Sequence, residues 1–163
     1  MGLDVGWYTR LTKLPTPTTP EEWDRFHDSG ALDLWENEDF PFTLEPLEPG
    51  FYECREGGSF QAGSYGTYGL WRRWLCKTVL GKEIEQIRYG SYNVKDPQPF
   101  YQLLNYSDCE GVLGTMVCEK LAQDFRVYEE KARYCGEPHD LVRYRDFADA
   151  FERASDGGCV VFF

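Results

Sequence analysis

The stretch around which the chain is organised is Phe60-Gln-Ala-Gly-Ser-Tyr-Gly-Thr-Tyr-Gly-Leu-Trp-Arg-Arg-Trp-Leu-Cys-Lys-Thr-Val79. It opens with glycine and serine and then follows a helical pattern. Ser64 is a suitable N-cap, because its hydroxyl can accept a hydrogen bond from a backbone N–H of the first turn. Gly81 stands where glycine commonly ends a helix. The stretch therefore predicts a central helix that begins after Ser64 and ends at Gly81.

Side chains of this helix fall on two stripes, because residues three and four apart share a helix face. One stripe, typical of a core, contains Trp71, Trp74, Leu75 and Thr78. The other contains Tyr65, Tyr68 and Arg72, which suit a pocket better than a core. Free N–H groups at a helix start bind anions, so the Ser64 turn and Arg72 are candidates for phosphate binding. The alternative is two ordinary half-buried tyrosines with Arg72 on the surface above them.

Composition narrows the class of partner. The chain has 163 residues, enough for one domain with a real core, and 17% of them are aromatic. Its formal net charge is −11, and such a surface repels DNA, RNA and anionic membranes. We therefore expect no nucleic-acid partner and no membrane association. A small phosphate-bearing ligand is still compatible, because a local site can be positive while the whole protein is negative.

The cysteines and the first residues indicate a cytoplasmic protein. None of the six cysteines forms a C-x-x-C pair or lies beside a histidine at metal-ligand spacing, so no metal and no cofactor are expected. The first residues lack the features of a signal peptide, and no stretch is long and apolar enough to span a bilayer. We expect the cysteines to be reduced and mostly buried.

The first third of the chain predicts strands, one short helix and an acidic loop. Residues 3–14 alternate as a strand does. Thr19, Pro20 and Glu22 mark the start of a helix that ends near Asp28. Residues 31–49 form an acidic, proline-containing loop with an edge strand at 42–44. Residues 50–54 and 59–62 read as a hairpin joined by the Glu56-Gly57-Gly58 turn.

The remainder predicts a lid, two long helices and two further strands. Residues 82–99 are a loop and a candidate lid over a site, or alternatively an ordinary variable loop. Residues 100–106 read as a strand, 114–134 as a long helix, the segment after Pro138 as the last helix, and 159–163 as a buried strand. The fold class is α+β: a single domain over 1–163, with a mostly antiparallel sheet of four or five strands and three or four helices packed on it.

A second candidate site follows residue 106, in Ser107-Asp108-Cys109-Glu110-Gly111. Asp108 and Glu110 face one side of an extended segment, where they could bind a ribose diol or a cation, or perform acid–base work. The alternative is that they cap the following helix. Asp156-Gly157-Gly158 is a third candidate, in which glycine allows close backbone approach to a ligand or simply ends a helix. The only histidines, His27 and His139, have no partner that the sequence implies, so a catalytic triad is unsupported.

The chain resembles a family found in genomes of tailed bacteriophages and prophages. The resemblance rests on Met1-Gly-Leu-Asp, on Ala62-Gly-Ser-Tyr with Tyr68 and Trp71-Arg72, on Asn105-Tyr-Ser-Asp-Cys-Glu-Gly111, and on Asp156-Gly-Gly with a terminal Phe. Thr115 stands where family members often have Pro, and residues 31–49 match nothing in the family. The resemblance implies a phage setting and transfers no activity. By analogy, small phage proteins with aromatic, arginine-containing pockets include sponges for nucleotide immune signals.

Three functions compete. The first is a binding protein, not an enzyme, that sequesters a small nucleotide-derived signal, such as a cyclic ADP-ribose isomer or a cyclic oligonucleotide, and so counters host anti-phage immunity. Its expected ligand-binding residues are Ser64, Tyr65, Tyr68, Trp71, Arg72, Ser107, Asp108, Glu110 and Asp156, with the pocket at a homo-oligomer interface. The second is a metal-assisted phosphodiesterase using Asp108, Glu110 and Asp156. The third is an acidic protein–protein inhibitor of a host defence enzyme. In the first case Arg72→Ala should remove binding with little loss of fold.

Overall fold

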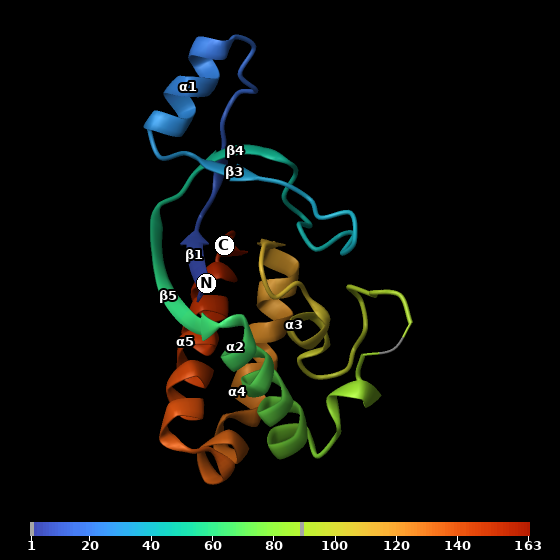
Figure 1. The fold of residues 1–163 in the computed structure, drawn as a ribbon. Helices are drawn as coiled ribbons and strands as arrows, with labels where there is room; N and C mark the ends of the chain where they lie inside the picture. The colour runs from blue at the N-terminus through green and yellow to red at the C-terminus, as the bar shows by residue number, and fades with distance from the viewer. Residues whose placement is uncertain (1, 89) are drawn as a thin grey trace.

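The computed structural model describes residues 2–88 and 90–163. It has two antiparallel sheets and helices packed on the larger one, so the α+β class is confirmed (Figure 1). The four-stranded sheet has the order β5 (Glu56–Ser64), β1 (Gly2–Thr9), β7 (Cys159–Phe162) and β6 (Gly111–Leu113). The three-stranded sheet has the order β2 (Thr12–Lys13), β4 (Gly50–Glu53) and β3 (Leu32–Leu34). The α-helices are α1 (Pro20–Asp28), α2 (Tyr65–Trp74), α3 (Tyr101–Asn105), α4 (Thr115–Cys135) and α5 (Pro138–Ala154).

One long, bent ribbon connects the two sheets. Thr9 pairs with Glu56 in the first sheet and Thr12 with Glu53 in the second, so the register is continuous across the bend. At the bend, Arg10 has a φ of 47°, and the N–H groups of Arg10 and Leu11 donate instead to the carbonyls of Asp156 and Gly157, at 2.8 and 2.9 Å. The Asp156-Gly157 turn therefore supplies the hydrogen bonds that the bent ribbon lacks.

The predicted hairpin between residues 50–54 and 59–62 is wrong. The two segments are successive parts of one bent strand, and each pairs with the first residues of the chain. Gly57 and Gly58 lie inside β5, at positions where aromatic rings leave no room for a side chain. A Cβ on Gly57 would lie 2.7 Å from the Tyr8 ring, and one on Gly58 would lie 2.7 Å from the Trp7 ring. The glycines thus mark a close approach of side chains rather than a turn.

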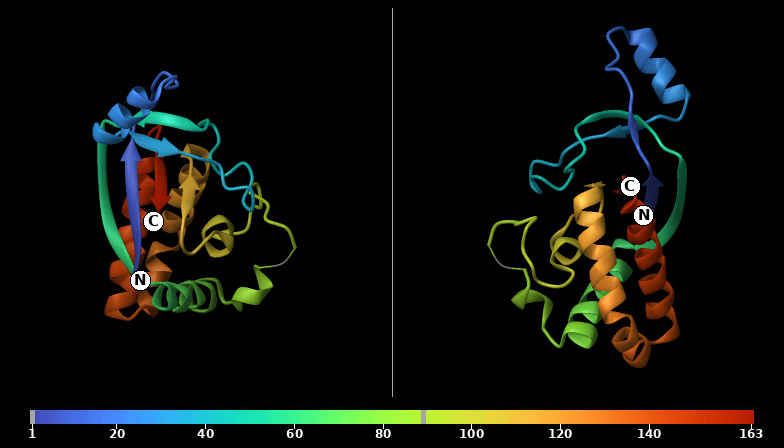
Figure 2. Two further views of the ribbon diagram at one scale, coloured as in Figure 1. Left: turned by 45° about the horizontal axis from the view of Figure 1, so that its top comes forward. Right: turned by 180° about the vertical axis from the view of Figure 1, so that it is seen from behind.

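The core has two parts, one on each face of the four-stranded sheet. Figure 2 shows α4 and α5 side by side against this sheet. Side chains of β7 alternate between the two parts, as the period of a strand requires: Val160 and Phe162 lie in the large helix-side cluster, and Cys159 and Val161 lie in a smaller cluster with Leu34. The sheet is therefore buried on both faces at β7, in agreement with the predicted buried final strand.

The predicted central helix is confirmed, with one local change. Ser64 caps α2 by accepting a hydrogen bond from the Thr67 N–H at 3.2 Å. The helix continues as a π-helical segment, η1 (Leu75–Leu80), and ends at Gly81, whose φ is 68°. The first short helix also begins as predicted, because the Thr19 hydroxyl accepts from the Glu22 N–H at 3.3 Å. The two long helices predicted near the end correspond to α4 and α5.

Three other predictions of secondary structure are wrong. Residues 101–105 form helix α3 rather than a strand, and an apolar buried run cannot by itself distinguish the two. The strand within the acidic loop is β3, while residues 42–44 form a turn. Strand β6 lies in the glycine-containing segment that the sequence reads as a loop. In the candidate lid, a 3₁₀ turn spans Ile84–Gln86; Tyr89 lies outside the described residues, and a lid function stays a prediction.

Candidate functional site

The structure brings together two of the sequence-predicted segments, α2 and the loop at residues 107–110. Nη1 of Arg72 donates to the carbonyl of Tyr106 at 3.0 Å, and Nη2 lies 3.4 Å from a carboxylate oxygen of Asp108. Nε of Arg88 donates to the carbonyl of Leu104 at 2.7 Å. Both arginines therefore bind carbonyls at the end of α3, where the negative end of the helix dipole favours cations.

The Tyr68–Arg72 side of α2 points into the protein, which corrects the prediction that it forms a pocket. The Arg72 guanidinium lies 4.5 Å from the centre of the Tyr68 ring, as in a cation–π contact. Tyr68 is fully buried, Arg72 is 4% exposed, and burial raises the pKa of Tyr68 to about 12. Tyr65 is half-buried and packs against the same cluster. A base cannot stack on Tyr68 in this arrangement, because the guanidinium and the core already cover both of its faces.

The remaining predicted residues lie in two separate places. Ser107, Asp108 and Glu110 belong to the loop after α3, where the Ser107 hydroxyl accepts from the Glu110 N–H at 3.3 Å. Asp156 precedes β7, whereas Gly111 pairs with Phe162 at the far end of β7. The phosphodiesterase hypothesis requires Asp156 to lie beside Asp108 and Glu110, and the structure places it elsewhere. Among the residues described, no three His, Cys, Asp or Glu side chains form a group that could hold a metal ion.

Asp156 and the glycines after it stabilise the bend of the ribbon. The Asp156 carboxylate forms a 2.6 Å ion pair with Nε of Arg10, in addition to the backbone bond described above. A Cβ on Gly158 would lie 1.8 Å from the carbonyl oxygen of Tyr8. The Asp-Gly-Gly sequence is thus explained by close packing of two backbone segments.

The candidate site that the structure offers is a hollow of about 310 Å³ beside the neighbouring, tryptophan-containing stripe of α2, next to the first turns of α5. Trp71 is almost completely buried and forms the base of the hollow, and Trp74 is partly exposed beside it. The two indole rings lie 6.3 Å apart. Trp71 is fixed by its N–H, which donates to the carbonyl of Asp140 at 3.2 Å. The full lining is Thr67, Leu70, Trp71, Trp74, His139, Asp140 and Arg143.

Polar side chains of α5 line the hollow together with the tryptophans of α2. His139 and Arg143 are four residues apart and therefore share a helix face. Within the described part of the chain, Arg143 forms no ion pair and donates no hydrogen bond. Its Nη2 lies beside Gly63, since a Cβ there would be 3.0 Å from this nitrogen. The guanidinium thus reaches the start of α2, where the helix dipole also favours an anion.

The carboxylate in the hollow is almost buried. Asp140 is 9% exposed, and its Oδ1 lies 3.5 Å from Nε2 of His139. The arrangement can hold a flat apolar ring against indole, an anionic group near Arg143, and a hydroxyl group near the His139–Asp140 pair. Neither His139 nor Arg143 was predicted from the sequence. The available signal was their spacing of four directly after Pro138.

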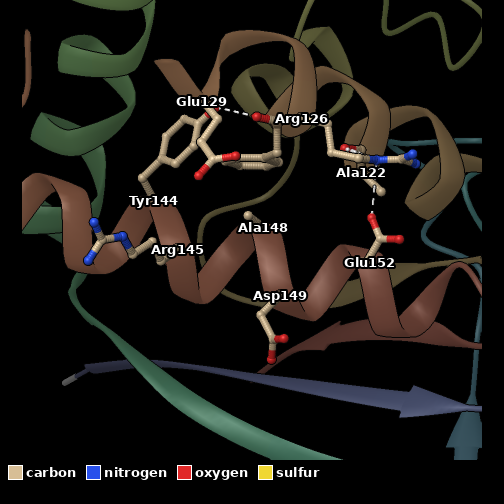
Figure 3. Close-up of a pocket in the computed structure, with 9 residues that line it drawn as sticks. Ala122, Arg126, Glu129, Tyr144, Arg145, Ala148, Asp149 and Glu152 are labelled. Atoms are coloured by element: carbon tan, nitrogen blue, oxygen red, sulfur yellow. Dashed lines mark hydrogen bonds and ion pairs between the residues drawn. The ribbon is translucent and has the colours of Figure 1, made fainter. Parts of the chain in front are cut away.

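A second hollow, between α4 and α5, is a poorer candidate (Figure 3). It measures about 290 Å³ and has Ala122, Phe125, Tyr144 and Ala148 as its apolar part. Apart from Arg145, its polar groups have partners within the described structure: for example, the Tyr144 hydroxyl donates to the Phe125 carbonyl at 2.7 Å, and Arg126 pairs with Glu152 at 3.2 Å. These contacts explain the groove as part of the packing of two helices.

Comparisons with known proteins do not assign a function. No protein-family model, curated protein or solved structure matches the chain. In the described residues, no helix combines the length and the apolar character needed to cross a membrane. The functional argument therefore depends on the residues of the α2–α5 hollow.

Proposed function

We propose that this protein binds a small nucleotide-derived ligand in the α2–α5 hollow and holds it without cleaving it. The observation that supports this most directly is the convergence of an aromatic wall with an unpaired arginine. Trp74 offers an indole face that is partly open, and Arg143 offers a guanidinium that forms no ion pair or hydrogen bond among the described residues. A volume of about 310 Å³ is at the lower end of the range for small-molecule sites.

Each part of such a ligand has a matching group. A base would stack on Trp74, an interaction worth about 1–3 kcal/mol per base in proteins that bind single-stranded nucleic acid. A phosphate would lie between Arg143 and the start of α2, because guanidinium binds phosphate through two parallel hydrogen bonds. A ribose hydroxyl would donate to Asp140 or bind the Thr67 hydroxyl. This set of contacts replaces the Tyr68–Arg72 pocket predicted from the sequence.

The phage setting implied by the resemblance suggests what the ligand does. In the cytoplasm of an infected bacterium, the protein would sequester a nucleotide immune signal, such as a cyclic ADP-ribose isomer or a cyclic oligonucleotide. We also propose a homo-oligomer. Leu70, which lines the hollow, is 68% exposed, and Val142 of α5 is 57% exposed; a second subunit would cover these apolar side chains and enclose the ligand.

A ligand panel tests the proposal. The protein is mixed with cyclic ADP-ribose isomers and cyclic dinucleotides, its melting temperature is measured, and the ligand is released by heating and analysed by mass spectrometry. A thermal shift with intact ligand recovered is the expected result. Recovery of a cleaved ligand would instead make the protein an enzyme, with His139 and Asp140 as its acid–base pair. Absence of a shift with every compound would overturn the proposal.

A matched pair of variants locates the site. Arg143→Gln should weaken the ligand that shifts most by about 10-fold or more, because a hydrogen bond to a charged group contributes about 1.5–3 kcal/mol. Arg145→Gln removes the same charge from the α4-facing side of the same helix and should leave affinity unchanged. Equal effects of the two variants would show that binding depends on overall charge and not on the hollow.

A further inference from the structure

Nearly all of the net charge of the protein is concentrated in one part of the chain, residues 20–53, here called the acidic segment. It contains 11 of the 28 acidic residues and, as its only lysine or arginine, Arg25. It therefore carries −10 of the formal net charge of −11, and the remainder is almost neutral. The segment begins with α1, which projects from the rest of the molecule (Figure 1).

Most carboxylates of the acidic segment have no cationic partner, although Glu22 accepts hydrogen bonds from Thr18 and Glu36 accepts one from the Phe42 N–H. Of its 11 acidic residues, Glu48 alone forms an ion pair within the described structure, with Lys13 at 2.6 Å. Elsewhere carboxylates commonly pair with a neighbouring cation, as in Arg133–Glu129 at 2.7 Å and Arg153–Asp149 at 2.8 Å. Crowding like charges without counterions opposes folding. A partner that supplied the missing cations would relieve this repulsion.

Exposed aromatic side chains accompany these carboxylates. No residue of α1 is buried. Trp23 packs against Phe51 with ring centroids 5.0 Å apart, yet remains 43% exposed. Trp35 is 39% exposed and Phe42 56%. Arginine is the cation that suits this mixture best, because its guanidinium both stacks on aromatic faces and forms paired hydrogen bonds with carboxylates.

We propose that the acidic segment, with α1 at its tip, is the docking surface for a partner protein that presents an arginine-rich face. Charge complementarity selects such a face, and the exposed indole rings favour arginine over lysine at the contact. This inference goes beyond the proposed ligand binding, since it uses none of the residues of the α2–α5 hollow. The protein would thus bind a small molecule with its helices and a basic protein surface with its acidic segment.

Octa-arginine and octa-lysine peptides test the chemistry of this surface. Their affinities for the full chain are measured by fluorescence anisotropy of labelled peptide over a series of salt concentrations. Octa-arginine should bind at low salt, should weaken as salt is added, and should bind several-fold more tightly than octa-lysine. Trp23→Leu, which keeps an apolar contact with Phe51, should remove much of this preference. Failure of octa-arginine to bind at low salt would overturn the proposal.

Two charge variants locate the surface. Asp24→Asn with Asp28→Asn on α1 should weaken octa-arginine binding by about twofold or more, because each exposed charge pair contributes only modestly. Glu119→Gln with Glu130→Gln removes two exposed, unpaired carboxylates from α4 and should change the affinity far less. If both variants weaken binding equally, or if both peptides bind equally well, binding depends on net charge alone and the proposal fails. Analytical ultracentrifugation without any peptide provides a further control. If the unmodified protein is an oligomer and the α1 variant is a monomer, the surface binds a second copy of the chain and the proposal fails.

Discussion

Truncation of Arg72 should destabilise the fold, the reverse of what the sequence indicates. Its guanidinium holds α2 against the end of α3 through the Tyr106 carbonyl at 3.0 Å and covers the Tyr68 ring at 4.5 Å. A hydrogen bond from a charged donor contributes about 1.5–3 kcal/mol, and a cation–π contact away from water about 2 kcal/mol. Against this, Nε of Arg72 has no partner in the described structure, so removing the side chain also removes a buried unpaired donor. We expect Arg72→Ala to lower the free energy of unfolding by about 2–4 kcal/mol.

Two companion variants separate the contributions. Arg72→Met fills much of the space and replaces a buried cation with an apolar group, a change that is often close to neutral, so its cost should be about 1 kcal/mol. Asp108→Asn should cost less than about 1 kcal/mol, because the Asp108 side chain is 54% exposed and such pairs contribute little.

Urea denaturation followed by tryptophan fluorescence measures all three variants. If Arg72→Ala costs less than about 1 kcal/mol, the guanidinium does not hold the two helices together and the reasoning fails. If Asp108→Asn costs as much as Arg72→Ala, the ion pair rather than the carbonyl and ring contacts is the main interaction.

Two further predictions concern backbone packing and pH. Gly158→Ala should lower the free energy of unfolding by about 2–4 kcal/mol, because the new Cβ would clash with the Tyr8 carbonyl. Gly69→Ala in α2 is the control: a Cβ there meets nothing within 4 Å, so this variant should stabilise the protein by up to about 1 kcal/mol. Burial raises the pKa of the Cys118 and Cys159 thiols above their ordinary value of 9.0 and the pKa of Tyr68, Tyr106 and Tyr144 above 10.0. The unfolded chain therefore ionises first. Stability should be constant below about pH 8, begin to fall near pH 9 as the unfolded thiols ionise, and fall by about a further 1.4 kcal/mol per pH unit for each tyrosine above pH 10. Chemical denaturation at several pH values measures this slope, and a flat profile up to pH 11 would contradict it.

The sequence predicted those elements whose signals are local. Thr19 and Ser64 cap their helices as their residue types indicate, and Gly81 ends its helix in the left-handed conformation. The errors arise where distant segments decide the structure. Gly57 and Gly58 resemble a turn in sequence, but the rings of Tyr8 and Trp7 over them are visible only in the folded ribbon.

The same distinction applies to the candidate site. Helical spacing correctly placed Trp71 and Leu75 in the core, yet it could not tell that Tyr68 and Arg72 on the neighbouring stripe are buried as well. Arg72 can be buried beside Tyr68 because the carbonyl of Tyr106, at the end of α3, accepts a hydrogen bond from its guanidinium, and α3 itself was read as a strand. The hollow beside the tryptophan-containing stripe depends on His139 and Arg143, whose approach to α2 is a long-range contact that spacing alone does not predict.

The central position of β7 has a consequence for synthesis. The edge of β1 that does not pair with β5 pairs with β7, Val5 opposite Phe162. While a ribosome is still making the chain, the β1–β5 ribbon can form, but that edge of β1 stays open until residues 159–162 have emerged. An open strand edge readily pairs with a strand of another chain. Nascent chains should therefore need chaperones, or rapid synthesis of the last residues, to avoid aggregation. A stalled chain lacking these four residues is expected to aggregate.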